Sequence, residues 1–153
     1  MSNKSAITAI VLLVLVIVSG YLFDNWTEEG YDIENIKVTN CKISESSCSV
    51  DLGDSKNVKV SITPKGIPET LPLIVNVDST GVSFDNVSVI FEGVEIDHNL
   101  PAFPLSRKDN YSFTGRALLS ICLLSEMNWI AHVVLKNQNN SWKVSFPFKS
   151  DRN

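Results

Sequence analysis

The segment from Ala6 to Phe23 runs for 18 residues without a charged side chain. At 1.5 Å per residue, a helix of this length reaches about 27 Å, close to the hydrocarbon thickness of a bilayer. Lys4 precedes the segment, whereas three acidic residues follow it between positions 24 and 29. Because basic residues favour the cytoplasmic side, the sequence predicts that residues 1–23 are a signal-anchor. This single span would lie in the cytoplasmic (inner) membrane, with the C-terminal domain in the periplasm.

A cleaved signal peptide is the alternative reading of this segment. Ala6–Val18 has the length of a signal-peptide hydrophobic region, and Ser19 and Gly20 supply small residues before a cut. Tyr21 and Trp26 lie beyond that point, and such aromatic residues are typical of anchors at a membrane interface. They favour an uncleaved transmembrane helix.

The charge of the remaining chain limits its partners. Lys4 is one of 13 basic residues, so 12 remain against 17 acidic residues after position 23, a net charge of −5. Nucleic acids and anionic membrane surfaces require clustered Lys and Arg, so neither is an expected partner. Residues 24–32 are polar and acidic, and we expect them to form a stalk between the anchor and a folded domain.

Short runs of alternating apolar and polar residues fill the rest of the chain, and turn-forming residues separate them. A period of two with one apolar face is typical of half-buried strands. About seven strands at this spacing predict an all-β domain over residues 33–150, an immunoglobulin-like antiparallel β-sandwich, with a small closed barrel as the alternative. The clearest runs are 58–63, 73–78, 87–92, 129–135 and 142–149, whereas Leu100–Pro104, with two prolines, has a turn composition.

Three cysteines are expected in an oxidising compartment if the domain is exported. Cys41 and Cys48 flank a short polar stretch that we interpret as a hairpin tip, and we predict a disulfide between them. Cys122 then remains as an unpaired thiol.

Cys122 and Met127 are the residues of the domain whose types indicate a possible metal site. A thiolate with a thioether is the ligand pair that selects Cu(I), and His98, in a loop-like stretch, could add an imidazole. The competing reading is that both residues only pack, because Cys and Met are common in protein cores. We predict no catalytic residues: the sequence has no metalloprotease, phosphate-loop or nucleophile-elbow motif.

Scattered motifs resemble those of small membrane-anchored periplasmic proteins of the FixH and YtkA-like kind. The resemblance implies an immunoglobulin-like domain, a protein partner in the membrane or periplasm, and a role in copper handling and oxidase assembly. Where the family pattern has a Met-x-Met-Gly stretch, this sequence has Val94-Glu95-Ile96-Asp97, which lacks sulfur. The matching elements are the anchor, Cys41 with Cys48, Thr63-Pro64 to Leu71-Pro72-Leu73, Phe91-Glu92-Gly93, Cys122 with Met127-Asn128-Trp129, and Phe146-Pro147-Phe148.

The expected function is therefore a membrane-tethered periplasmic accessory domain, not an enzyme, that assists respiratory oxidase assembly or copper delivery. Its expected metal ligands are Cys122, Met127 and His98. The alternative is a structural or interaction subunit of a cell-envelope complex with no metal role.

Overall fold

The computed structural model describes residues 7, 10–19, 33–95, 98–119 and 126–151. The chain divides into two compact units, Met1–Tyr31 and Asp32–Asn153. Residues 10–19 of the first unit are helical. Within the described part of the chain, no helix is both long enough and apolar enough to cross a membrane. The predicted stalk, residues 24–32, lies outside the described residues.

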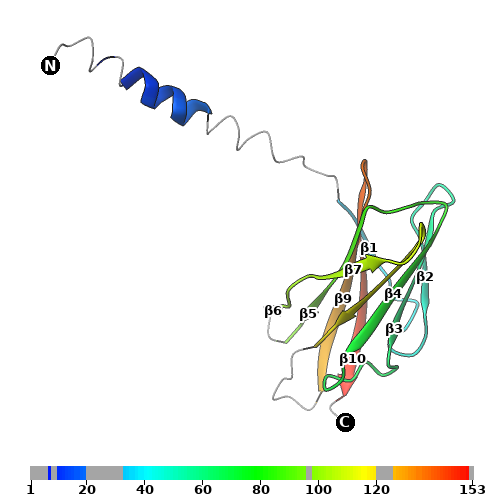
Figure 1. The fold of residues 1–153 in the computed structure, drawn as a ribbon. Helices are drawn as coiled ribbons and strands as arrows, with labels where there is room; N and C mark the ends of the chain where they lie inside the picture. Colours follow the sequence, from blue (N-terminus) through cyan, green and yellow to red (C-terminus); the bar gives the residue numbers. More distant parts are fainter. Residues whose placement is uncertain (1–6, 8–9, 20–32, 96–97, 120–125, 152–153) are drawn as a thin grey trace. The chain divides into compact units, whose positions relative to one another are not determined.

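The second unit is all-β, as the alternating runs predicted (Figure 1). Alternating burial accompanies the alternating sequence, as in β4, where every second side chain from Leu73 to Ser79 is buried. The described strands are β1 (Ile33–Lys37), β2 (Cys48–Asp51), β3 (Asn57–Thr63), β4 (Leu73–Thr80), β5 (Asn86–Gly93), β6 (His98–Asn99), β7 (Phe103–Arg107), β8 (Ser112–Ala117), β9 (Glu126–Lys136) and β10 (Ser141–Asp151).

These strands form one continuous sheet in the order β1-β10-β9-β5-β7-β8-β4-β3-β2, and β6 pairs with β5 off this path. All described pairs are antiparallel except β1 with β10. β7 joins the two halves of the sheet. Phe103 to Leu105 pair with β5, and the next two residues, Ser106 and Arg107, pair with β8.

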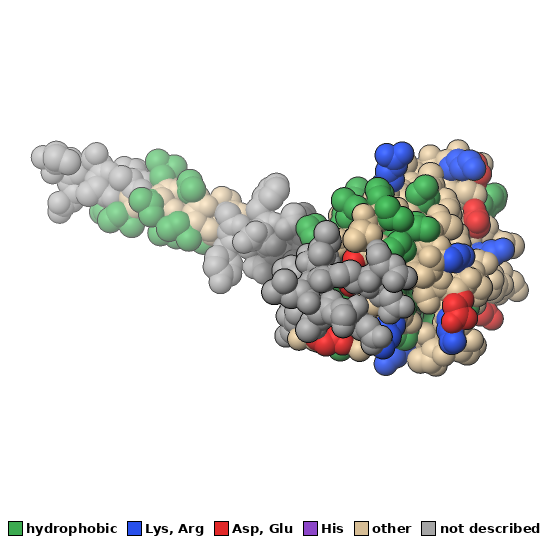
Figure 2. Space-filling view, turned by 90° about the horizontal axis from the view of Figure 1, so that it is seen from below, with side chains coloured by type: hydrophobic (Ala, Val, Ile, Leu, Met, Phe, Trp, Pro, Cys, Tyr) green, Lys and Arg blue, Asp and Glu red, His purple; other side chains and the backbone are tan. Residues whose placement is uncertain are grey.

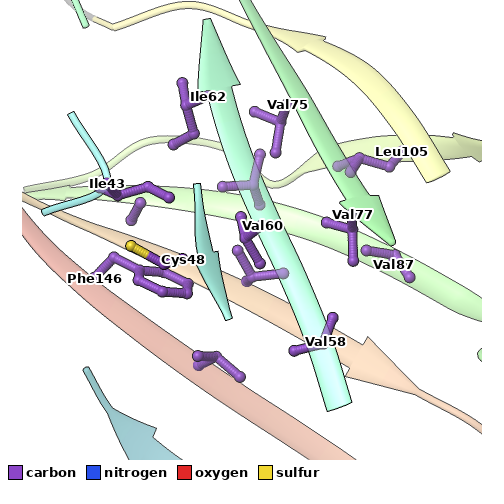
Figure 3. Packing of buried hydrophobic residues seen from close by; sticks show 14 of the residues in the cluster. Ile43, Cys48, Val58, Val60, Ile62, Val75, Val77, Val87, Leu105 and Phe146 are labelled. Atoms are coloured by element: carbon purple, nitrogen blue, oxygen red, sulfur yellow. The ribbon is translucent and has the colours of Figure 1, made fainter. Parts of the chain in front are cut away.

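The core lies between the two halves of the sheet. Figure 3 shows Val60 and Ile62 of β3 and Val75 of β4 in the same buried cluster as Phe146 of β10. Burial follows the alternation of the runs 129–135 and 142–149, and five side chains of β9 and β10 are each at most 1% exposed. These are Trp129, Val133, Leu135, Val144 and Phe146.

One predicted turn is shorter than expected. Residues 100–102 connect β6 to β7 as the turn composition predicted, but Phe103 and Pro104 belong to β7, in which Pro104 pairs with Ser88 of β5. Proline is tolerated where a strand needs few ladder hydrogen bonds, and β7 makes only short ladders before it changes partner. Pro104 therefore lies within a short bridging strand, whereas Pro101 lies in the connection before it.

Candidate functional site

The structure places the predicted metal ligands in different settings. Met127 lies on β9, and its side chain is fully buried. His98 opens the short strand β6, but its side chain is not described, and Cys122 lies outside the described residues. Of the predicted metal ligands, only Met127 therefore has a described side-chain environment.

The sheet register separates His98 from the strand that carries Met127. Gly93 of β5 pairs with His98 on one side and with Trp129 of β9 on the other. Neighbouring strands lie about 4.8 Å apart, so the backbones of His98 and Trp129 are about 10 Å apart. Met127 is two residues further along β9.

The predicted disulfide is present. Cys41 and Cys48 are bonded, with their Cα atoms 5.8 Å apart. Their setting differs from the predicted hairpin tip, because β1 pairs with β10 whereas β2 pairs with β3. The bridged loop therefore connects two strands at opposite ends of the strand order, and Ile43 within it is fully buried in the core.

A buried carboxylate lies at the end of the core that carries Met127. Glu69 is only 3% exposed, although it sits in the connection between β3 and β4. Ser150 Oγ donates to Glu69 Oε1 at 2.6 Å, and Trp129 Nε1 donates to Ser150 Oγ at 3.0 Å and lies 3.5 Å from Glu69 Oε1. Glu69 Oε2 is buried and has no hydrogen-bond partner among the described residues.

No pattern in the sequence marks Glu69 as buried. A single acidic residue between Pro68 and Thr70 resembles many exposed loop residues, and periodicity does not extend into a loop. Two left-handed residues, Gly66 at φ +81° and Ile67 at φ +48°, turn this chain segment. A proline-glycine cluster followed by an isolated charge was the available signal, but it predicted only a turn.

A second polar cluster lies on the opposite face of β9. His132 Nε2 lies 2.7 Å from Glu92 Oε2, and His132 Nδ1 lies 2.8 Å from Ser145 Oγ. Because a carboxylate accepts hydrogen bonds, the Nε2–H of His132 donates to Glu92. Both ring nitrogens of this buried histidine thus link β5, β9 and β10, which is a structural use of His132.

Glu95 joins the end of β5 to β9. Its carboxylate accepts hydrogen bonds from Asn128 N at 3.0 and 3.2 Å. Desolvation raises the pKa of Glu95, but the hydrogen bonds from Asn128 and the charge of Lys149 outweigh it, so the pKa lies below the ordinary value.

An apolar patch is exposed at one end of β4 and β8. Figure 2 shows hydrophobic side chains gathered on one face of this unit. Ile74 lies opposite Arg116 in the sheet, and a hollow of about 250 Å³ beside it is lined by Pro72, Phe103 and Leu118, among others. We define the β4–β8 patch as Leu71, Pro72, Ile74, Phe103 and Leu118; Leu71, Ile74 and Leu118 are 50%, 43% and 54% exposed.

Metal ligands do not cluster among the described side chains. That part of the chain contains no group of three or more His, Cys, Asp or Glu residues able to hold a metal ion. Comparisons of the chain with protein-family models, with curated proteins and with solved structures found no match.

Proposed function

We propose that this chain is a non-enzymatic accessory protein, tethered to the cytoplasmic membrane by residues 1–23, with its β domain in the periplasm. The helix over residues 10–19 carries this proposal. All nine side chains from Ile10 to Val18 are apolar and between 47% and 69% exposed. A helix that is apolar on every side has no polar face to present to water, and a bilayer is a solvent that suits it.

The domain is proposed to be an immunoglobulin-like sandwich. Two pairings between strands distant in sequence, β4 with β8 and β5 with β9, support this reading, because Greek-key connections of this kind are typical of such sandwiches. The two halves of the sheet would then be its layers, with β7 as the strand that passes between them.

The proposed role is to hold a protein partner at the membrane. A tether keeps the domain at high effective concentration beside a membrane protein, so even a small contact surface gains occupancy. The β4–β8 patch suits such contact, since exposed apolar clusters mark interaction sites. Assembly of a respiratory oxidase, or delivery of its copper, is the specific form of this role that we propose.

In the copper form of the role, Met127 supplies a soft thioether, and Cys122 and His98 are the further proposed ligands. The second candidate is an interaction subunit of a cell-envelope complex without a metal role. The β4–β8 patch favours this candidate, because it provides a contact surface without any metal ligand. If the protein takes up Cu(I) stoichiometrically and Cys122→Ser abolishes this uptake, the result would support the copper form of the role, with Cys122 as a ligand.

Membrane fractionation and a reporter test the tether. We expect the full chain to stay in the membrane after carbonate extraction, and a phosphatase fused after Asn153 to be active in the periplasm. Val14→Lys places a charge at the centre of the helix and should release the protein, whereas the control Val14→Ala should not. A fusion that is active only in the cytoplasm would refute the proposed topology.

A further inference from the structure

A hollow of about 660 Å³ lies beside the disulfide loop, which we define as residues 42–47 between the two bonded cysteines. Three segments that are far apart in the sequence line it: the disulfide loop, the connection between β3 and β4, and the end of β10. Small-molecule sites usually measure about 300–1,000 Å³, so this hollow has the size of a ligand site.

This hollow is positively charged in a chain that is acidic as a whole. Its lining contains three lysines, Lys42, Lys65 and Lys149, and one carboxylate, Glu45. Three positive charges against one negative charge leave the lining at a formal charge of +2, whereas the whole chain has a net charge of −4. Lys42 pairs with Glu45 at 2.9 Å, and the charge of Lys149 also acts on Glu95. An anion is the ligand whose charge complements such a lining.

The walls that carry the lysines are anchored to the core. Ile43 in the disulfide loop and Ile67 in the connection between β3 and β4 are both fully buried. Gly66 N donates to Ser44 O at 2.8 Å, so a hydrogen bond joins the two segments directly. The disulfide closes the first of them. Because these walls are held in place before a ligand arrives, binding orders little of the chain and its entropic cost is reduced.

An apolar hollow of about 400 Å³ adjoins the basic one. Pro147 and Phe148 of β10 line both hollows. Val94 and Ile130 also line the second hollow, and Val94 is 50% exposed. Lys37, at the end of β1, adds a further positive charge to this lining. A charged group and an apolar group of one molecule can therefore be bound side by side.

We propose that the two hollows form one binding site for a small amphiphilic phosphate ester. Its phosphate group lies among Lys42, Lys65 and Lys149, and its alkyl portion lies against Val94 and Pro147. A lysine ammonium binds phosphate as a point charge. A phosphate monoester carries a charge of about −1.5 to −2 at pH 7, so it matches the basic lining better than a carboxylate does. This site depends neither on the proposed tether nor on copper.

Free phosphate monoesters and phospholipid headgroups share this chemistry, so each source needs its own probe. Hexyl phosphate represents the free ester. Dihexanoyl-phosphatidylglycerol, kept below the concentration at which it forms micelles, represents the phospholipid. Inorganic phosphate and hexanol test the anionic group and the alkyl group separately.

Backbone amide signals of the full-length protein, in nanodiscs of net-neutral phosphatidylcholine, report on both hollows. Gly66 lines the basic hollow and Val94 the apolar one, whereas Gly81 follows β4 at the other end of β3 and serves as the reference. We expect hexyl phosphate to shift the signals of Gly66 and Val94 and inorganic phosphate to shift that of Gly66 alone. Because the alkyl chain buries methylene groups, hexyl phosphate should bind at least about tenfold more tightly than inorganic phosphate.

Matched variants separate the two halves of the site. The double variant Lys42→Gln/Lys65→Gln should weaken the binding of both phosphates about fivefold, because each exposed charge contributes modestly. Lys59→Gln removes an exposed lysine of β3 that lines neither hollow, and it should leave both affinities unchanged. Val94→Ser should weaken the binding of hexyl phosphate at least about threefold and leave that of inorganic phosphate unchanged.

Three results would overturn the site: equal affinities for hexyl phosphate and inorganic phosphate, equal affinities for hexyl phosphate and hexanol, or an unchanged affinity in the double lysine variant. All the replaced side chains are exposed, so the thermal midpoints of the variants should match that of the parent and exclude misfolding as a cause. Tighter binding of hexyl phosphate than of the phospholipid would support the site with a free ester as its ligand. The reverse order would support the site with a lipid headgroup as its ligand.

Discussion

Trp129 combines packing with a polar contact at a single buried position. The indole is 1% exposed, and its N–H donates to Ser150 Oγ at 3.0 Å. Replacing a buried large aromatic by alanine removes apolar contacts and leaves a cavity, so Trp129→Ala should lower the free energy of unfolding by about 3–5 kcal/mol. Urea denaturation measures this loss. Leu118→Ala, at a 54% exposed position, is the control and should stay within about 0.5 kcal/mol of the parent. A loss below about 1 kcal/mol for Trp129→Ala would contradict the burial of the Trp129 side chain.

Glu95 gives the stability a dependence on pH. Desolvation raises its pKa, but the hydrogen bonds from Asn128 and the charge of Lys149 hold the net value below the ordinary 4.5. A carboxylate with a lowered pKa in the folded state stabilises the fold above its unfolded pKa, and this contribution disappears as the pH falls through the folded pKa. Glu95→Gln should therefore flatten the fall in stability below about pH 4.5, as followed by urea midpoints between pH 7 and pH 3.

The partner of Glu95 provides the matched test. Asn128→Ala removes the side-chain donor, so it should flatten the acid dependence in the same direction but less, because the backbone N–H of residue 128 still donates. Equal acid dependence in the parent and in Glu95→Gln would show that the pKa of Glu95 is not lowered in the folded protein.

At the level of single residues, sequence patterns predict burial within strands but not the contacts between distant segments. The alternation of apolar and polar residues in β9 and β10 indicates which of their side chains are buried, because neighbouring residues of a strand point to opposite faces. Glu69 and the contacts of His132 follow no period, since they depend on which distant segments meet. Glu69 meets Ser150 across 81 positions, and His132 meets Glu92 across 40.

Among the elements, the turn after β4 depends on a glycine. Gly81 has φ +78°, and a Cβ atom there would lie 2.5 Å from the backbone oxygen of Ser55. Gly66 has a similar φ of +81° but no atom within 4 Å of the same position. Both Gly→Ala changes incur the left-handed strain of about 1–2 kcal/mol, but only Gly81→Ala adds a clash with backbone. Thermal unfolding should therefore show a larger loss of stability for Gly81→Ala than for Gly66→Ala. Equal losses of stability would contradict the close approach of Gly81 to the backbone of Ser55.

The strands themselves differ in how well the sequence predicts them. β3, β4, β5, β9 and β10 alternate clearly, because each presents one face to the core. β1 is mostly exposed, so it lacks the alternation that marks a half-buried strand. β7 carries a proline and changes partner midway. The alternation of apolar and polar residues thus predicts strands that are buried on one face. It does not predict strands that are defined mainly by their pairing.

At the scale of the whole molecule, the proposed tether and the β4–β8 patch make one combined prediction. A photo-reactive residue at position 118, within the patch, should form a discrete adduct with a protein partner when the full chain is in its native membrane. The same probe at Asn139, in the exposed polar turn between β9 and β10, is the control and should form none. Ile74→Ser should remove the adduct without changing thermal unfolding, because Ile74 is 43% exposed and contributes little to the core. Since the tether alone places every surface near the same neighbours, adducts of equal yield at positions 118 and 139 would show that proximity, and not the patch, determines the contact.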